Sequence, residues 1–172
     1  MKRFLTPDHY FDDLDKIEND FFDNNKIKVI FCDIDNTLVR YSEREATEYA
    51  SRFIERVLSK GVKFVLISNN SDVKRGEIFL GNNEVLLLPR AAKPILSTGK
   101  MKKMLKTLGL KKEDAIIFGD QIFTDVLAGR FCGMRTMLVD PLGPSLIPLF
   151  EIKRFFEKPI KKRFVKKYGK NI

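Results

Sequence analysis

Two aspartates separated by one isoleucine are the first feature of this sequence that suggests chemistry. Asp33 and Asp35 come at the end of the apolar run 29–32. Successive side chains of a strand point to opposite sides, so these two carboxylates would address the same site. Close carboxylates repel unless a cation lies between them or one is protonated. In phosphoryl transfer, one can attack phosphorus while the other protonates the leaving group and later activates water.

Three further polar clusters follow later apolar runs. Ser68 and Asn69 come first, Lys93 is next, and Asp120 and Asp125 are last. Any one cluster alone is also explained by solvated strand ends, a loop hydroxyl or a surface lysine. Four clusters in order, each at the carboxyl end of a predicted parallel strand, predict one shared crevice.

The elements that must position these residues alternate along the chain. Short, nearly continuous apolar runs alternate with segments of helical period, which is typical of a parallel sheet covered by helices on both faces. The predicted strands are 28–35, 63–69, 84–88, 115–119 and 136–140. The predicted helices are 43–59, 72–80, 97–108 and 124–132, the last three opening on a possible Asp, Ser or Thr cap, with Gly61, Gly109 and Gly133 as stop signals.

The first and last segments are predicted separately from this core. Thr6-Pro7 can start a helix, and the apolar residues that follow at helical spacing predict a packing helix at 6–20. We find no internal repeat or linker. Residues 1–145 are therefore expected to form the core, and residues 146–172 a basic tail that belongs to the same domain or lies peripheral to it.

Over about residues 28–140 the four ordered motifs resemble those of the haloacid dehalogenase (HAD) superfamily of phosphohydrolases. The resemblance implies a three-layer, Rossmann-like parallel sheet. It implies that Asp33 is the nucleophile and Asp35 the general acid and base. It also implies that Ser68 and Lys93 hold the transferred phosphoryl oxygens.

The same resemblance implies a Mg²⁺ site. Asp33, Asp120 and the backbone carbonyl of Asp35 would be ligands, and Asp125 either a ligand or a support for the loop. Mg²⁺ prefers carboxylate and water oxygens, which agrees with this set. Thr37 and Asn69 are the candidates for contact with substrate.

One departure and two short gaps refine this comparison. Asn36 stands where many superfamily members have Gly, but Asn tolerates left-handed backbone geometry. The gaps between the first three motifs are too short for a large cap domain, so the site is expected to be open. The motifs look like those of the capless YqeG-type branch, which includes phosphatidylglycerophosphate phosphatases.

Charge is concentrated at the end of the chain. Of a net charge of +9, residues 151–172 carry +7, from nine Lys or Arg against two Glu. Ile160, Phe164 and Tyr168 recur at four-residue intervals in this tail, as in a basic helix at an anionic membrane. The alternative is a helix docked on the body with solvated lysines. If the tail only binds membranes, its removal should spare the hydrolysis of a small ester.

These features leave three functions open. The first is a phosphatidylglycerophosphate phosphatase, the second a phosphatase of soluble sugar, nucleotide or nucleic-acid phosphates, and the third a catalytically silent binding module. No apolar run approaches the roughly 20 residues of a membrane span, and no signal peptide is evident. Two cysteines form no disulfide framework. A cytoplasmic protein, peripheral at the membrane if the tail binds lipid, is expected.

Overall fold

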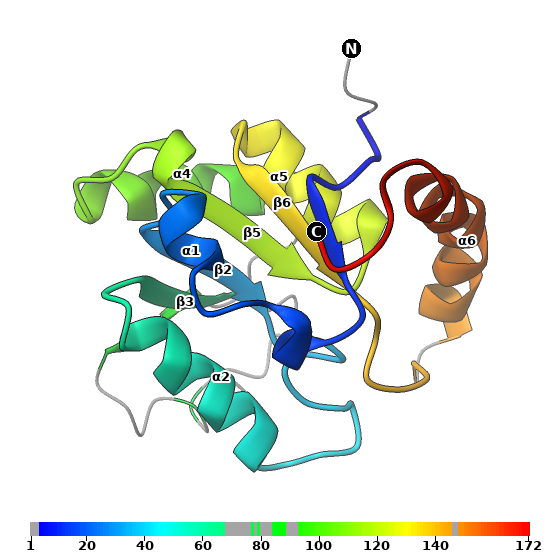
Figure 1. Cartoon of the computed structure of the whole chain (residues 1–172), viewed down its shortest axis with the longest axis horizontal. Helices are drawn as coiled ribbons and strands as arrows, with labels where there is room; N and C mark the ends of the chain where they lie inside the picture. Colours follow the sequence, from blue (N-terminus) through cyan, green and yellow to red (C-terminus); the bar gives the residue numbers. More distant parts are fainter. Residues whose placement is uncertain (1–3, 68–76, 78, 80–83, 89–92, 146–147) are drawn as a thin grey trace.

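A six-stranded parallel sheet forms the centre of the chain in the computed structural model (Figure 1), which describes residues 4–67, 77, 79, 84–88, 93–145 and 148–172. The strands lie in the order β1-β6-β5-β2-β3-β4, and all neighbouring pairs are parallel. Their bounds are β1 His9–Phe11, β2 Val29–Asp33, β3 Lys63–Ile67, β4 Val85–Leu88, β5 Ala115–Gly119 and β6 Arg135–Val139. The predicted α/β class is confirmed.

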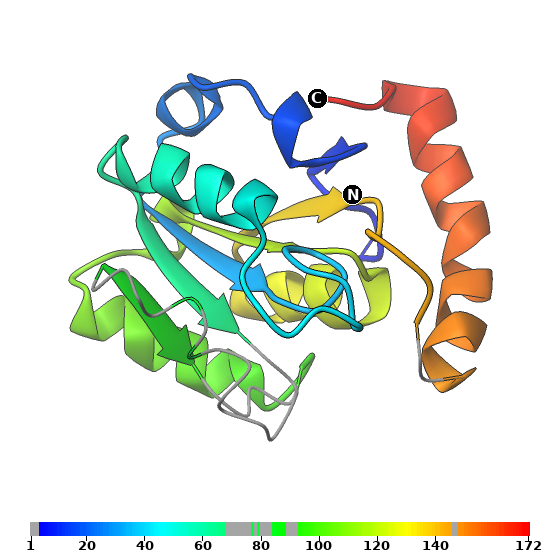
Figure 2. The ribbon, with the colours of Figure 1, turned by 90° about the horizontal axis from the view of Figure 1, so that it is seen from below.

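Alternating side chains of the central strands build a core on each face of the sheet. Ile30 and Cys32 of β2 belong to the core under α2 (Glu48–Leu58), whereas Val29 and Phe31 belong to the core under α4 (Ser97–Thr107) and α5 (Leu127–Cys132). Because both faces are covered, the strands are apolar at nearly every position. The result is the expected three-layer arrangement, seen edge-on in Figure 2.

The predicted helices differ from the observed ones mainly at their starts. Thr47 caps α2 by accepting a hydrogen bond from the Ala50 amide at 3.2 Å, so this helix begins later than residue 43. The last predicted helix begins earlier, because a π-helical turn, Ile122–Val126, precedes α5. Thr124 therefore lies inside the π-helical turn and is not a cap. Ser97 is not a cap either, because it is the first residue of α4, and its hydroxyl donates to the Pro94 carbonyl.

The stop signals are confirmed. Gly61, Gly109 and Gly133 adopt φ of 70°, 67° and 71°, the left-handed geometry that ends helices. The predicted helix 72–80 lies almost entirely outside the described residues.

The packing helix predicted at 6–20 is wrong. This segment contains the edge strand β1 and a 3-10 turn, Leu14–Lys16, and the short helix α1 (Phe21–Asn24) follows. Tyr10 pairs in register with Leu138, and the neighbouring Phe11 is buried in a different core cluster. Asp13 accepts from the Asp15 and Lys16 amides and so starts the turn. Burial of a strand followed by a turn produced apolar spacing that resembles one helical face.

The basic tail folds into helix α6 (Pro148–Tyr168), which lies beyond the carboxyl ends of β5 and β6 in both ribbon views (Figures 1 and 2). Phe164 is buried, and Ile160 and Val165 pack beside it against Tyr10 and its neighbours. The docked alternative is thus correct for part of the helix. None of the described helices is both long and apolar enough to cross a bilayer.

Candidate active site

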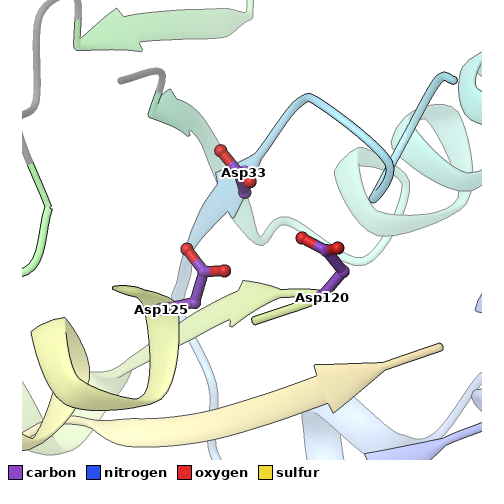
Figure 3. A group of neighbouring side chains, drawn as sticks. All are labelled: Asp33, Asp120 and Asp125. Carbon is purple, nitrogen blue, oxygen red and sulfur yellow. The ribbon is translucent and has the colours of Figure 1, made fainter. Parts of the chain in front are cut away.

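Three aspartates from two neighbouring strand ends converge on one point. Asp33 ends β2, Asp120 directly follows β5, and Asp125 lies in the π-helical turn after it. Because β2 and β5 are adjacent and parallel, these ends meet. One carboxylate oxygen from each residue lies within 4.8 Å of the other two (Figure 3), and all three side chains are buried. Such a donor set fits a hard divalent cation.

Gly119 allows Asp125 to reach this point. A Cβ at position 119 would lie 2.2 Å from the Asp125 Cγ atom, closer than any real contact. The Asp125 carboxylate is held there by the Gln121 amide, which donates to Oδ2 at 3.1 Å, and by the Thr124 hydroxyl at 3.2 Å. The last residue of β5 therefore positions an acid six residues further along the chain.

Lys93 lies among the acids with its side chain almost fully buried. Its Nζ atom is 2.7 Å from Asp33 Oδ1 and 2.5 Å from Asp125 Oδ1. Burial acts to lower the pKa of Lys93, but the charges and hydrogen bonds of Asp125 and Asp33 together outweigh it and raise that pKa. The lysine is therefore a fixed cation that bridges two of the three acids.

The carboxylates themselves are electrostatically crowded. Burial raises the pKa of Asp33, and the charges of Asp125 and Asp120 add to this, against the opposing effect of Lys93. Burial, together with the Asp125 charge, raises the pKa of Asp120 to about 6, while Arg154 opposes the shift. A site with this much negative charge is one that a divalent cation stabilises.

The turn after β2 carries Asp35 and Thr37. Asn36 adopts φ 60°, which confirms that Asn here takes the left-handed geometry expected from the sequence. Asp35 is bridged to Val39 through its backbone, and its carboxylate is not among the three converging acids. The Thr37 hydroxyl and the side-chain amide of Asn36 are buried without a hydrogen-bond partner among the described residues.

Ser68 and Asn69 lie outside the described residues. The strand that leads to them, β3, ends at Ile67, which is in register with Asp33. Their roles stay predictions.

Sequence reasoning missed a second set of contacts, made by α6. Arg154 Nη2 donates to Asp120 Oδ2 at 2.8 Å, and Lys161 Nζ donates to the Asp120 carbonyl at 3.2 Å. Glu157 Oε1 accepts from the Phe123 amide at 2.9 Å. Lys and Arg in a basic helix are usually solvated, so their residue types do not predict these contacts. The only available signal was the helical spacing of residues 154, 157 and 161, which puts them on the same face of the helix as Phe164. Because of these contacts, we expect removal of the tail to disturb the site.

Comparisons with known proteins agree with this geometry. A family model described as HAD-hydrolase-like matches residues 93–141, which include Lys93, Asp120 and Asp125. The probable phosphatase YqeG of Bacillus subtilis (strain 168) is 32% identical over 146 residues, covering 84% of this chain and 83% of that protein. The crystal structure of an uncharacterized protein from Listeria monocytogenes serotype 4b has a TM-score of 0.51 and 17% identity, over 79% of this chain and 99% of that one. The last similarity concerns the fold alone.

The parallel sheet, the acidic cluster at its carboxyl edge and these similarities define a phosphatase of the haloacid dehalogenase class. Within that superfamily, the chain belongs to the family of the probable phosphatase YqeG.

Proposed function

We propose that this phosphatase is a Mg²⁺-dependent phosphomonoester hydrolase that works through an aspartyl phosphate on Asp33. The observation that carries the proposal is the convergence of Asp33, Asp120 and Asp125, two of which, Asp33 and Asp125, pair with the buried ammonium of Lys93. Nucleophilic catalysis by a carboxylate needs the negative charge of the incoming phosphate to be neutralised, and buried cations do this well. A bound Mg²⁺ would neutralise further charge on the phosphoryl oxygens.

In the first step, a carboxylate oxygen of Asp33 attacks phosphorus and the bond from phosphorus to the ester oxygen breaks. Asp35 gives its proton to the departing alkoxide, so the alcohol leaves neutral. In the second step, Asp35 takes a proton from water, which attacks the acyl phosphate and releases inorganic phosphate. Asp33 is thereby regenerated. Lys93, Ser68, Asn69 and Thr37 hold the phosphoryl oxygens in this scheme.

Removal of divalent ions tests the proposal. A chelator should abolish turnover of a small aryl phosphate, and added Mg²⁺ should restore it, because three buried carboxylates need a cation to accept a phosphate anion. Phosphate release followed against Mg²⁺ concentration measures the effect. Full activity in excess chelator would contradict the metal requirement and leave the acidic cluster without its proposed role.

We propose phosphatidylglycerophosphate as the substrate, with anionic membranes as the place of action. Exposed apolar residues stand next to the cations that contact the aspartates. Ile95 and Leu96, which closely follow Lys93, are 68% and 71% exposed, and Phe155 and Phe156, which directly follow Arg154, are 66% and 60% exposed. Lys158, Lys162 and Lys166 are exposed on the same helix. Aromatic residues among cations suit the interface of an anionic bilayer.

The paired substitution Phe155→Ser with Phe156→Ser tests this choice. Each lost aromatic side chain removes about 1.5–3 kcal/mol of apolar burial, so turnover of phosphatidylglycerophosphate in anionic vesicles should fall at least tenfold. Turnover of a soluble aryl phosphate should not change. Phe131→Ser, at a half-exposed residue of α5, is the matched control. Equal wild-type rates on lipid and soluble phosphates, unaffected by the paired substitution, would instead favour the soluble-substrate alternative.

A further inference from the structure

The Asp120 carboxylate has a partner that comes from a distant part of the chain. Arg154 of α6 donates to Asp120 Oδ2 from Nη2, at 2.8 Å. The two side chains are 11% and 0% exposed, so solvent screens this ion pair little. Asp120 is also one of the three acids that could hold a cation. Arg154 therefore contacts a residue that we propose as a metal ligand.

The guanidinium group is itself held from the other side. Arg154 Nη1 donates to the Gly143 carbonyl at 2.9 Å and pairs with Glu151 Oε1 at 2.9 Å. Glu151 Oε1 in turn accepts from the Ser145 amide at 2.7 Å. A planar fork fixed at three acceptors has little freedom to rotate, and a lysine ammonium could not reproduce it.

The helix that carries Arg154 is fixed to the same loop by two neighbours. Glu157 accepts from the Phe123 amide, and Lys161 donates to the Asp120 carbonyl. Glu157 is fully buried; burial raises its pKa to about 7, against the opposing effect of the Phe123 amide. One turn further along, Phe164 is buried against Tyr10. The position of Arg154 relative to Asp120 is therefore set by three more contacts of α6.

Asp120 needs such a partner because of its neighbours. Like charges at Asp33 and Asp125 disfavour an orientation in which its carboxylate faces them. With Oδ2 bound to Arg154, the carboxylate plane is fixed and the remaining oxygen lone pairs can serve a cation. Ligating carboxylates are commonly held in this way, and loss of the supporting group typically weakens metal affinity 10–100-fold.

We propose that Arg154 is a positioning residue, which orients Asp120 for the divalent cation and makes α6 part of the active site. This inference rests on the metal-dependent function proposed above. It assigns to the basic helix a role inside the site, in addition to any contact with a membrane.

Direct measurement of Mg²⁺ binding tests the proposal. Titration calorimetry on the full chain should show Mg²⁺ affinity 10–100-fold lower in Arg154→Ala. Arg154→Lys should fall between Ala and wild type, because it keeps the charge but loses the fork. At saturating Mg²⁺, kcat for a small aryl phosphate should recover most of its wild-type value. Arg163→Ala, an exposed arginine of the same helix, should leave Mg²⁺ affinity unchanged.

The outcomes separate the two proposals. If Arg154→Ala folds, by circular dichroism, and binds Mg²⁺ as tightly as wild type or more tightly, Arg154 acts as an opposing charge or as a packing residue and the inference is wrong. If the wild-type chain itself binds no Mg²⁺, the proposed function fails, whatever the variant does.

Discussion

Asp33→Asn is expected to lower phosphate release by roughly 10⁴-fold or more, because loss of a nucleophile removes the covalent route. The amide has nearly the same shape as the carboxylate but lacks its charge and nucleophilicity. Asp33 contacts Lys93 at 2.7 Å, and the amide oxygen can still accept from that ammonium, so the fold should persist. Steady-state hydrolysis of an aryl phosphate measures kcat, and acid quenching with a labelled substrate measures the acyl phosphate.

The control for this substitution is Asp15→Asn, at an exposed position in the 3-10 turn and outside the acidic cluster. It should keep wild-type kcat. The label that acid quenching traps on the wild type should be sensitive to hydroxylamine, as acyl phosphates are, and absent from Asp33→Asn. If acid quenching also traps hydroxylamine-sensitive label on Asp33→Asn, a different carboxylate is the nucleophile.

Lys93→Met is expected to lower kcat by roughly 10²–10³-fold, the usual cost of removing one preorganised charge partner of a transition state. Methionine is similar in length but cannot neutralise the phosphoryl oxygens. It also leaves Asp33 and Asp125 without the cation that now bridges them. The measurement is kcat at saturating Mg²⁺, together with a thermal melt that checks the folded state.

Lys106→Met, an exposed lysine of α4, is the matched control and should match wild type in both assays. A well-folded Lys93→Met variant with wild-type kcat would assign the lysine to charge balance in the resting site and exclude it from the chemical step.

The central strands and the acidic cluster could be predicted from the sequence because their signals are local. A strand such as β2 is buried on both faces, so its apolar run is continuous and ends where Asp33 begins. Polar residues at such ends must lie at the carboxyl edge of the sheet, and parallel pairing of β2 with β5 then brings Asp33 and Asp120 together. Lys93 followed from its order relative to the acids.

The edge strand and the contacts of α6 could not be predicted, because their causes are distant in sequence. β1 has three residues, too few to show a period of two, and its partner β6 lies more than 120 residues away. From the sequence alone, Arg154 is predicted to be a solvated cation, because its partner Asp120 lies 34 residues earlier in the chain. The folded arrangement, rather than any local pattern, assigns it an inward side chain.

The contacts that a single helix, α6, makes with the Asp120 loop have a consequence for protein engineering. The chemical groups Asp33, Lys93 and Asp125 belong to the sheet and its loops, whereas α6 follows them in the chain. The exposed residues Phe155 and Phe156 can therefore be substituted to change the surface that α6 presents to solvent. The hydrogen bonds of Arg154, Glu157 and Lys161 to the Asp120 loop would be kept. The surface of α6 that we propose to contact membranes and the acidic cluster are thus encoded in separate stretches of the gene.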